Sequence, residues 1–179
     1  MNIVVYCGSC DGVAEKYIRA ARDLGACIGQ NGHGLVYGAS NCGLMGVLAQ
    51  SAHEHGAKIY GVGLEMFHSR VGAYGLIDDL YVAKTFSERR NKMIELGDAF
   101  IALPGGTGTL DEISEILCIG KFYFPDKEII FFDVDGFYQG IKDYLSHAEK
   151  EGFLYPGQMD RVHFTRTIEE IDALLGKAK

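Results

Sequence analysis

Short apolar segments alternate with longer amphipathic ones along the chain. The short segments predict β-strands at residues 3–7, 34–37, 58–62, 79–83, 99–103 and 128–132. Continuous apolar runs of this length are typical of a parallel sheet that is buried on both faces. Between them, a 3.6-residue period predicts helices at residues 13–28, 43–55, 87–96, 109–122, 137–149 and 168–175. This alternation predicts an α/β fold, a doubly wound, Rossmann-like and mostly parallel sheet flanked by helices.

The stretch from 65 to 77 is the only long one without a period, and we expect a loop there. A chain of 179 residues has the size of one domain, so residues 1–179 are expected to form a single Rossmann-like domain. Ligands of such folds bind beyond the carboxyl ends of the strands. Many of the 24 glycines follow the predicted strands, at that edge of the sheet.

Charge and composition argue against several classes of function. The 17 Lys and Arg residues against 24 Asp and Glu residues give a net charge of −7, so neither nucleic acid nor an anionic membrane is an expected partner. No apolar run approaches the roughly 18 residues of a membrane span. No secretion signal precedes the first strand, and we therefore expect a cytoplasmic protein whose five cysteines stay reduced.

The strongest chemical signal is the segment 102–112, ALPGGTGTLDE. A buried strand here runs into a turn with three glycines in four positions and then into a helix. Glycine lets backbone N–H groups approach an anion, and a helix N-terminus carries roughly half a positive charge. The segment therefore predicts a phosphate cradle formed by Gly105, Gly106, Thr107, Gly108 and Thr109. In the alternative, the segment is a tight turn in which Thr109 caps the helix and Glu112 completes a capping box.

The cradle lacks the Lys-Ser or Lys-Thr of a Walker A loop, and Asp111 stands where a G-x-G-x-x-G motif has its third glycine. A monophosphate is therefore favoured over a triphosphate or a dinucleotide. Because Asp111 and Glu112 would repel a phosphate, at least one of them should face a cation. Arg89 and Arg90, at the start of the preceding helix, are expected to supply it. The alternative there is a solvated helix face on which Glu88 pairs with Lys92.

Two further glycine turns follow predicted strands and are expected to form other walls of the same crevice. Gly8 and Ser9 follow the first strand, and Gly43, Met45 and Gly46 follow the second. Small residues there would let a sugar or a base approach the backbone. In the alternative for Gly46, the glycine only allows close packing of a helix on a strand.

Cys7 and Cys10 form a C-x-x-C pair, which leaves a redox site as another alternative. The other cysteines are isolated, and His53 and His55 point to different faces of a helix, so we expect no metal site.

Several motifs together resemble the Lonely Guy (LOG) family. They are Cys7-Gly8-Ser9, Gly43-Leu44-Met45-Gly46, Arg89 with a following base, and Pro104-Gly105-Gly106-x-Gly108-Thr109-x-x-Glu112. The resemblance extends from Ile3 to about Phe153. Members of this family are cytokinin-activating nucleoside 5′-monophosphate phosphoribohydrolases, formerly described as possible lysine decarboxylases.

The resemblance implies hydrolysis of the bond between base and ribose 5-phosphate, without metal or cofactor, commonly in a homodimer. It implies that Arg89 and Glu112 are the catalytic pair, that Arg90 stands where a lysine is usual, and that residues 105–109 bind the phosphate. The chain departs from the family pattern at Ala39, Thr107 and Cys118. These departures bear on the expected base-binding pocket more than on the expected reaction.

The residues themselves agree with this chemistry. Breaking an N-ribosyl bond develops positive charge on the sugar, which a carboxylate such as Glu112 can stabilise, or it can activate water. We therefore expect a hydrolase that converts a purine nucleoside 5′-monophosphate, AMP or cytokinin-type, to free base and ribose 5-phosphate. Two alternatives are a non-catalytic nucleotide-binding or sensing module and a pyridoxal phosphate-dependent lysine decarboxylase, for which Lys92 is the lysine near a motif.

Overall fold

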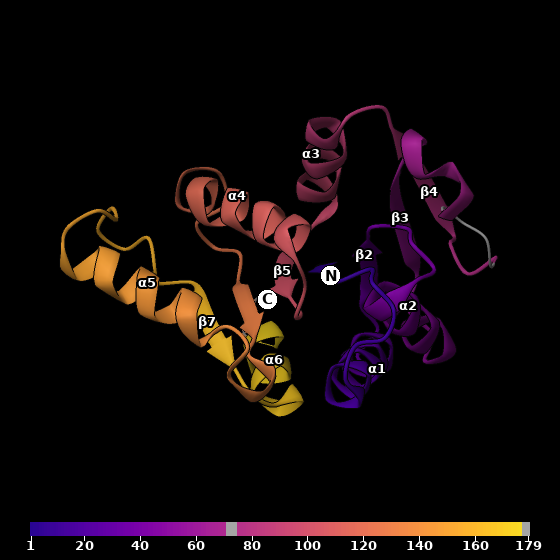
Figure 1. Cartoon of the computed structure of the whole chain (residues 1–179), viewed down its shortest axis with the longest axis horizontal. Coiled ribbons are helices and arrows are strands. Elements are labelled where there is room, and N and C mark those ends of the chain that lie inside the picture. Colours follow the sequence, from indigo (N-terminus) through magenta and orange to yellow (C-terminus); the bar gives the residue numbers. More distant parts are fainter. Residues whose placement is uncertain (71–74, 177–179) are drawn as a thin grey trace.

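The computed structural model describes residues 1–70 and 75–176 (Figure 1). Its strands form one seven-stranded sheet with the order β4-β3-β2-β1-β5-β6-β7, and every neighbouring pair is parallel. The strands are β1 (Asn2–Tyr6), β2 (Gly34–Tyr37), β3 (Ile59–Leu64), β4 (Asp79–Ala83), β5 (Ala99–Ala102), β6 (Ile129–Phe132) and β7 (Val162–Thr165). The α-helices are α1 (Glu15–Gln30), α2 (Gly43–Glu54), α3 (Phe86–Leu96), α4 (Thr107–Tyr123), α5 (Gln139–Lys150) and α6 (Ile168–Leu175). The predicted doubly wound α/β class is confirmed.

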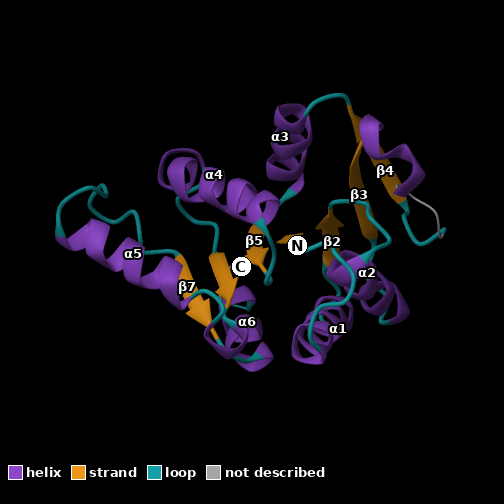
Figure 2. Cartoon of the chain, viewed as in Figure 1, coloured by secondary structure: helices purple, strands orange, loops and turns teal. Residues whose placement is uncertain are grey.

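Helices cover both faces of the sheet, with α1, α2 and α6 on one face and α3, α4 and α5 on the other (Figure 2). Side chains of successive strand residues point to opposite faces. In β1, Ile3 and Val5 therefore join the core under α1 and α2, whereas Val4 and Tyr6 join the core under α3 and α4. Burial on both faces explains why this strand carries an unbroken apolar run.

The direction in which the chain crosses the sheet reverses once. From β1 it proceeds through β2 and β3 to the edge strand β4, and it then returns to place β5 on the other side of β1. Such a reversal leaves a crevice at the carboxyl ends of the two central strands, because their connections leave in opposite directions. The loops after β1 and β5 flank this crevice.

Two segments differ from the sequence expectation. Strand β7 was not predicted, because Val162–Thr165 mixes polar and apolar residues; as an edge strand it is only partly buried. The expected loop at 65–77 begins with a 3₁₀ helix, η1 (Glu65–Arg70), and residues 71–74 of it lie outside the described part of the chain. Within the described residues, no helix combines the length and the apolar character that crossing a membrane requires.

Candidate active site

A cavity of about 550 Å³ opens at the carboxyl edge of the sheet, where the connections reverse. Most of the predicted site residues line it: Gly8, Ser9, Met45, Arg89, Arg90, Gly105, Gly106, Thr107, Gly108, Thr109, Asp111 and Glu112. Gly43 and Gly46 do not line it. They face a second cavity of about 380 Å³ beside α2. A Cβ on Gly46 would overlap the Asn41 backbone, so this glycine allows close packing at the start of α2.

The glycine loop joins β5 to α4, which begins at Thr107 after the N-cap residue Gly106. No side chain caps this helix, so its first N–H groups remain available to an anion from the cavity. The capping-box alternative is therefore wrong, because Thr109 lies inside the first turn and is buried. The uncapped N–H groups together with the helix dipole give this end of the cavity a positive electrostatic character.

The loops after β1 and β5 touch each other because Gly105 has no side chain. The Gly8 N–H donates to the Pro104 carbonyl over 3.1 Å. A Cβ on Gly105 would lie 2.9 Å from the Gly8 nitrogen and would overlap the Thr109 hydroxyl. Any larger residue would push the two loops apart and widen this end of the cavity.

Arg89 and Glu112 form a buried ion pair at the centre of the cavity wall. Their exposed fractions are 8% and 7%, and Nη1 of Arg89 donates to Oε1 of Glu112. Nε of Arg89 donates to the Val62 carbonyl at 2.8 Å, so the guanidinium is fixed from two sides. Burial raises the pKa of Glu112, and the Arg89 charge opposes this rise. The sequence argument that a carboxylate beside the cradle must face a cation is confirmed.

Arg90 forms ion pairs with two other carboxylates of α4. It contacts Asp111 at 2.9 Å through Nη1 and Glu115 through Nε. The alternative, in which Glu88 pairs with Lys92 on a solvated helix face, is wrong. Glu88 accepts hydrogen bonds from the Tyr81 hydroxyl and, over 3.0 Å, from the Lys84 N–H, and these bonds lower its pKa.

Three further residues shape the wall of the cavity. Gly38 follows β2, and a Cβ there would overlap Nη2 of Arg89 and lie 3.0 Å from the Met45 sulfur. The bare Gly38 backbone thus leaves room for the guanidinium. The other two are Phe67 of η1 and Phe86 of α3. A glycine directly after a predicted strand was the available signal for Gly38, whereas the two phenylalanines belong to no motif.

The redox and decarboxylase alternatives find no support in this geometry. Cys7 is buried, and burial raises the pKa of its thiol, which is the opposite of what a reactive thiolate needs. Lys92 pairs with Glu95 at 3.0 Å on the surface of α3. No lysine lines the cavity in the described ranges 1–67 and 75–176, so a Schiff-base residue is lacking there.

Comparison with known proteins agrees with the motifs. A family described as "Possible lysine decarboxylase" matches residues 45–175. The chain belongs to this family, the LOG family. It is 36% identical to a cytokinin riboside 5′-monophosphate phosphoribohydrolase of Rhodococcoides fascians, over 94% of this chain and 85% of that protein. It is 32% identical to the enzyme of the same name, LOG3, from Arabidopsis thaliana, over 95% of this chain and 79% of the relative.

Solved structures resemble the LOG chain at lower sequence identity. The molybdenum cofactor carrier protein of Chlamydomonas reinhardtii superposes with a TM-score of 0.75 and 20% identity, covering 99% of this chain and 96% of that one. The molybdenum cofactor binding protein of Rippkaea orientalis gives a TM-score of 0.71 at the same 20% identity, over 98% of this chain and 95% of that one. These likenesses support the α/β fold.

Proposed function

We propose that this LOG-family chain hydrolyses the N-glycosidic bond of a purine nucleoside 5′-monophosphate, AMP or a cytokinin-type nucleotide, and releases free base and ribose 5-phosphate. The observation that carries the proposal is the buried Arg89–Glu112 pair beside an uncapped, glycine-rich helix start. An anion site next to a buried carboxylate suits a phosphorylated sugar whose anomeric carbon becomes positive. The names of the relatives support the same reaction.

The phosphate lies against the N–H groups of residues 105–109, with Gly8 and Ser9 of the neighbouring loop closing over it. The Arg90 charge is shared between Asp111 and Glu115, so it balances these carboxylates near the incoming anion. Binding of the phosphate fixes the ribose over Glu112. Holding a reactant in one geometry in this way lowers the barrier of the reaction.

The bond between C1′ and the base nitrogen breaks with its electron pair on the base, and C1′ becomes positive. The ionised Glu112 stabilises this charge, and its burial strengthens the attraction because water does not screen it. A water oxygen bonds to C1′, and its proton passes to Glu112 and then to the departing base. Arg89 positions Glu112 and favours its ionised form. No metal and no cofactor take part in these steps.

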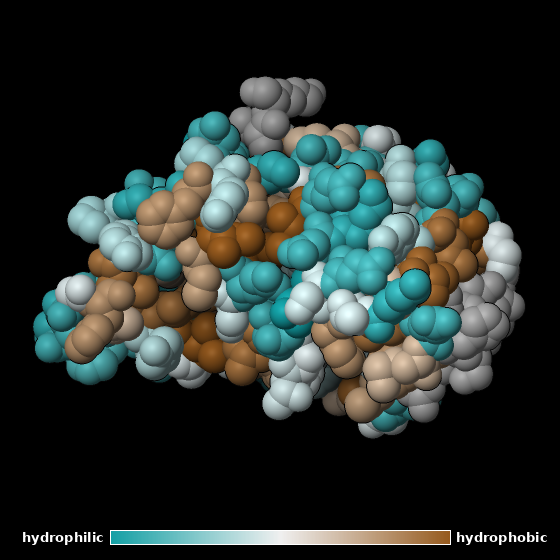
Figure 3. Space-filling model, turned by 90° about the horizontal axis from the view of Figure 1, so that it is seen from above, coloured by the Kyte–Doolittle hydropathy of each residue, from teal (hydrophilic) through white to brown (hydrophobic). Residues whose placement is uncertain are grey.

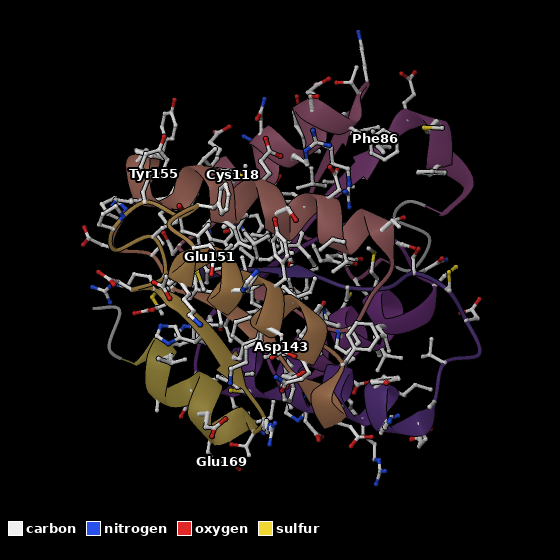
Figure 4. All side chains as sticks on the ribbon, turned by 60° about the vertical axis from the view of Figure 1, so that its left-hand side comes forward. Phe86, Cys118, Asp143, Glu151, Tyr155 and Glu169 are labelled. Carbon is white, nitrogen blue, oxygen red and sulfur yellow. The ribbon has the colours of Figure 1, made fainter. Side chains whose placement is uncertain are left out.

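The proposal includes a homodimer, with a second copy bound to an apolar patch on α4. The patch comprises Phe122, Tyr123 and Tyr155, whose exposed fractions are 58%, 79% and 63%. The Phe122 and Tyr155 rings meet edge to face, and Tyr155 lies beside α4 near Cys118 (Figure 4). Seen from above, hydrophobic residues lie on the left-hand half of the molecule, which holds α4 and α5 in Figure 1, and others lie on its right-hand side (Figure 3). Aromatic patches of this kind are typical of interfaces.

Light scattering at micromolar concentration tests the dimer. The wild-type chain should have twice the mass of the monomer, and Tyr123→Glu should have the monomer mass. A wild-type monomer would contradict the dimer.

The reaction is tested with AMP and adenosine as substrates of the wild-type chain. We expect adenine and ribose 5-phosphate in equal amounts from AMP and at least a hundredfold less adenine from adenosine, which lacks the phosphate. Chromatography of both products measures this. Equal release from both substrates would contradict the role of the glycine loop, and release from neither AMP nor an N6-alkylated AMP would contradict the reaction.

A further inference from the structure

Two phenylalanines from separate elements meet at the mouth of the cavity. Phe67 lies in η1 and Phe86 is the first residue of α3, and their ring centroids are 6.5 Å apart with 76° between the ring planes. Figure 4 shows the Phe86 ring at the start of α3, on the side of η1. Both rings line the cavity, and their exposed fractions are 43% and 51%. Neither belongs to a hydrophobic core, so packing of the fold does not account for them.

The order of the strands places this corner opposite the phosphate end. The phosphate loops follow β5 and β1, whereas Leu64 ends β3 and Phe67 follows it, two strands further along the sheet. Strands are spaced by about 4.8 Å, so β1 and β3 are about 10 Å apart. This distance is comparable to the one between the phosphate and the base of an extended nucleotide.

The reacting pair lies between these two ends. Arg89 is one helical turn after Phe86, and it reaches both the Val62 carbonyl in β3 and Glu112 of α4. A nucleotide with its phosphate at the glycine loop and its ribose at Glu112 therefore extends its base toward Phe67 and Phe86.

Among the residues that the structure describes, the wall around this end offers few hydrogen-bonding groups that could distinguish one base from another. The residues that line the cavity after β2 and β3 are Gly38, Ser40, Leu44, Met45, Leu64 and Phe67. None of them carries a charge, and Ser40 has the only side chain with a hydroxyl among them. Discrimination between bases of one size needs fixed hydrogen-bonding partners, because an unpaired polar group is what rejects the wrong base.

We propose that Phe67 and Phe86 form an aromatic corner that selects the base by its flat area, so that purine monophosphates are preferred over pyrimidine monophosphates while AMP and GMP are accepted alike. This inference rests on the proposed function. With 76° between the rings, a base stacked on one phenyl ring meets the other ring with its edge. Stacking depends on the area of overlap and tolerates different bases. The two fused rings of a purine fill the corner better than the single ring of a pyrimidine.

Calorimetric binding of AMP, GMP, CMP and ribose 5-phosphate tests the corner, together with kcat/KM for the three nucleotides. The wild-type affinities for AMP and GMP should agree within about threefold, and CMP should bind at least tenfold more weakly. Base–aromatic stacking supports roughly a tenfold to hundredfold effect on removal of a ring. Phe86→Leu, which keeps an apolar side chain without a flat face, should weaken AMP and GMP at least tenfold, and Phe86→Tyr should restore them.

Ribose 5-phosphate has no base, so its affinity should be the same in all these variants. Phe153→Ala is the matched control, because Phe153 is 83% exposed and does not line the cavity. Three results would overturn the inference: loss of ribose 5-phosphate binding in Phe86→Leu, a tenfold or larger difference between AMP and GMP in the wild type, or unchanged nucleotide affinities in Phe86→Leu. If the wild type releases no base, the proposed function fails. The binding data still test whether the aromatic corner holds the base.

Discussion

Replacing Gly38 by alanine tests whether the position of the Arg89 guanidinium controls the reaction. A Cβ at residue 38 would overlap Nη2 of Arg89 and would also crowd the Met45 sulfur at 3.0 Å. The guanidinium must therefore shift. Its bond to the Val62 carbonyl, its bond to Glu112, or both must then lengthen.

The expected change in kcat follows from the two hydrogen bonds of Arg89 that would be weakened. A hydrogen bond to a charged group contributes about 1.5–3 kcal/mol. Since about 1.4 kcal/mol in the barrier changes a rate tenfold, loss of the geometry around Glu112 should reduce kcat by about 10- to 100-fold. The free energy of unfolding should fall by a similar 1–3 kcal/mol, since a buried pair would be weakened.

Steady-state kinetics with AMP, together with thermal unfolding, measures both effects. Gly140→Ala is the matched control. Gly140 lies on α5, and a Cβ there has no heavy atom within 4 Å, so activity should be unchanged and stability slightly higher. If Gly38→Ala and Gly140→Ala have the same kcat within twofold, the argument that Arg89 must be held in this place is refuted.

Two further predictions concern the pH profile and the support of the glycine loop. Because burial raises the pKa of Glu112 and the ionised form is the active one, the acid limb of kcat against pH should lie above the ordinary value of 4.5; a limb at or below 4.5 would contradict the role of Glu112. A raised pKa in the folded state also means that the stability contribution of this group is full at low pH and is lost as pH rises through that pKa, which pH-dependent unfolding measures. The Tyr138 hydroxyl donates to the Leu103 carbonyl at 2.7 Å, directly before the glycine loop, so Tyr138→Phe should lower the free energy of unfolding by about 1 kcal/mol and raise KM for AMP more than it changes kcat. An unchanged KM with wild-type stability would show that this bond does not position the loop.

Much of the fold could be predicted from the sequence, because burial on both faces of a parallel sheet leaves unbroken apolar runs. The runs at β1 and β6 are of this kind, and both strands are buried. Strand β7 was not predicted, because an edge strand needs no unbroken apolar run and because its sequence contains the polar residue His163. The start of α4 was placed two residues late, since glycine at the N-cap gives no side-chain signal.

The centre of the site could be inferred from electrostatics alone. Two carboxylates beside a phosphate cradle require cations, and the nearest arginines supply them. The same reasoning could not say which arginine is buried, because this depends on Val62 of β3 and on Gly38, which follows β2. Phe67 and Phe86 are neighbours only after folding, since no periodic pattern connects a loop residue to the first residue of a helix.

The central claim is that Glu112 carries out the bond cleavage while the glycine loop binds the nucleotide. The most direct test compares Glu112→Gln with the wild type in a single-turnover reaction with AMP, alongside calorimetric binding of ribose 5-phosphate. Glu95→Gln, an exposed change on α3, is the control. We predict at least a hundredfold slower adenine release from Glu112→Gln, with ribose 5-phosphate affinity within threefold of the wild type. Adenine release at the wild-type rate from Glu112→Gln would contradict the account.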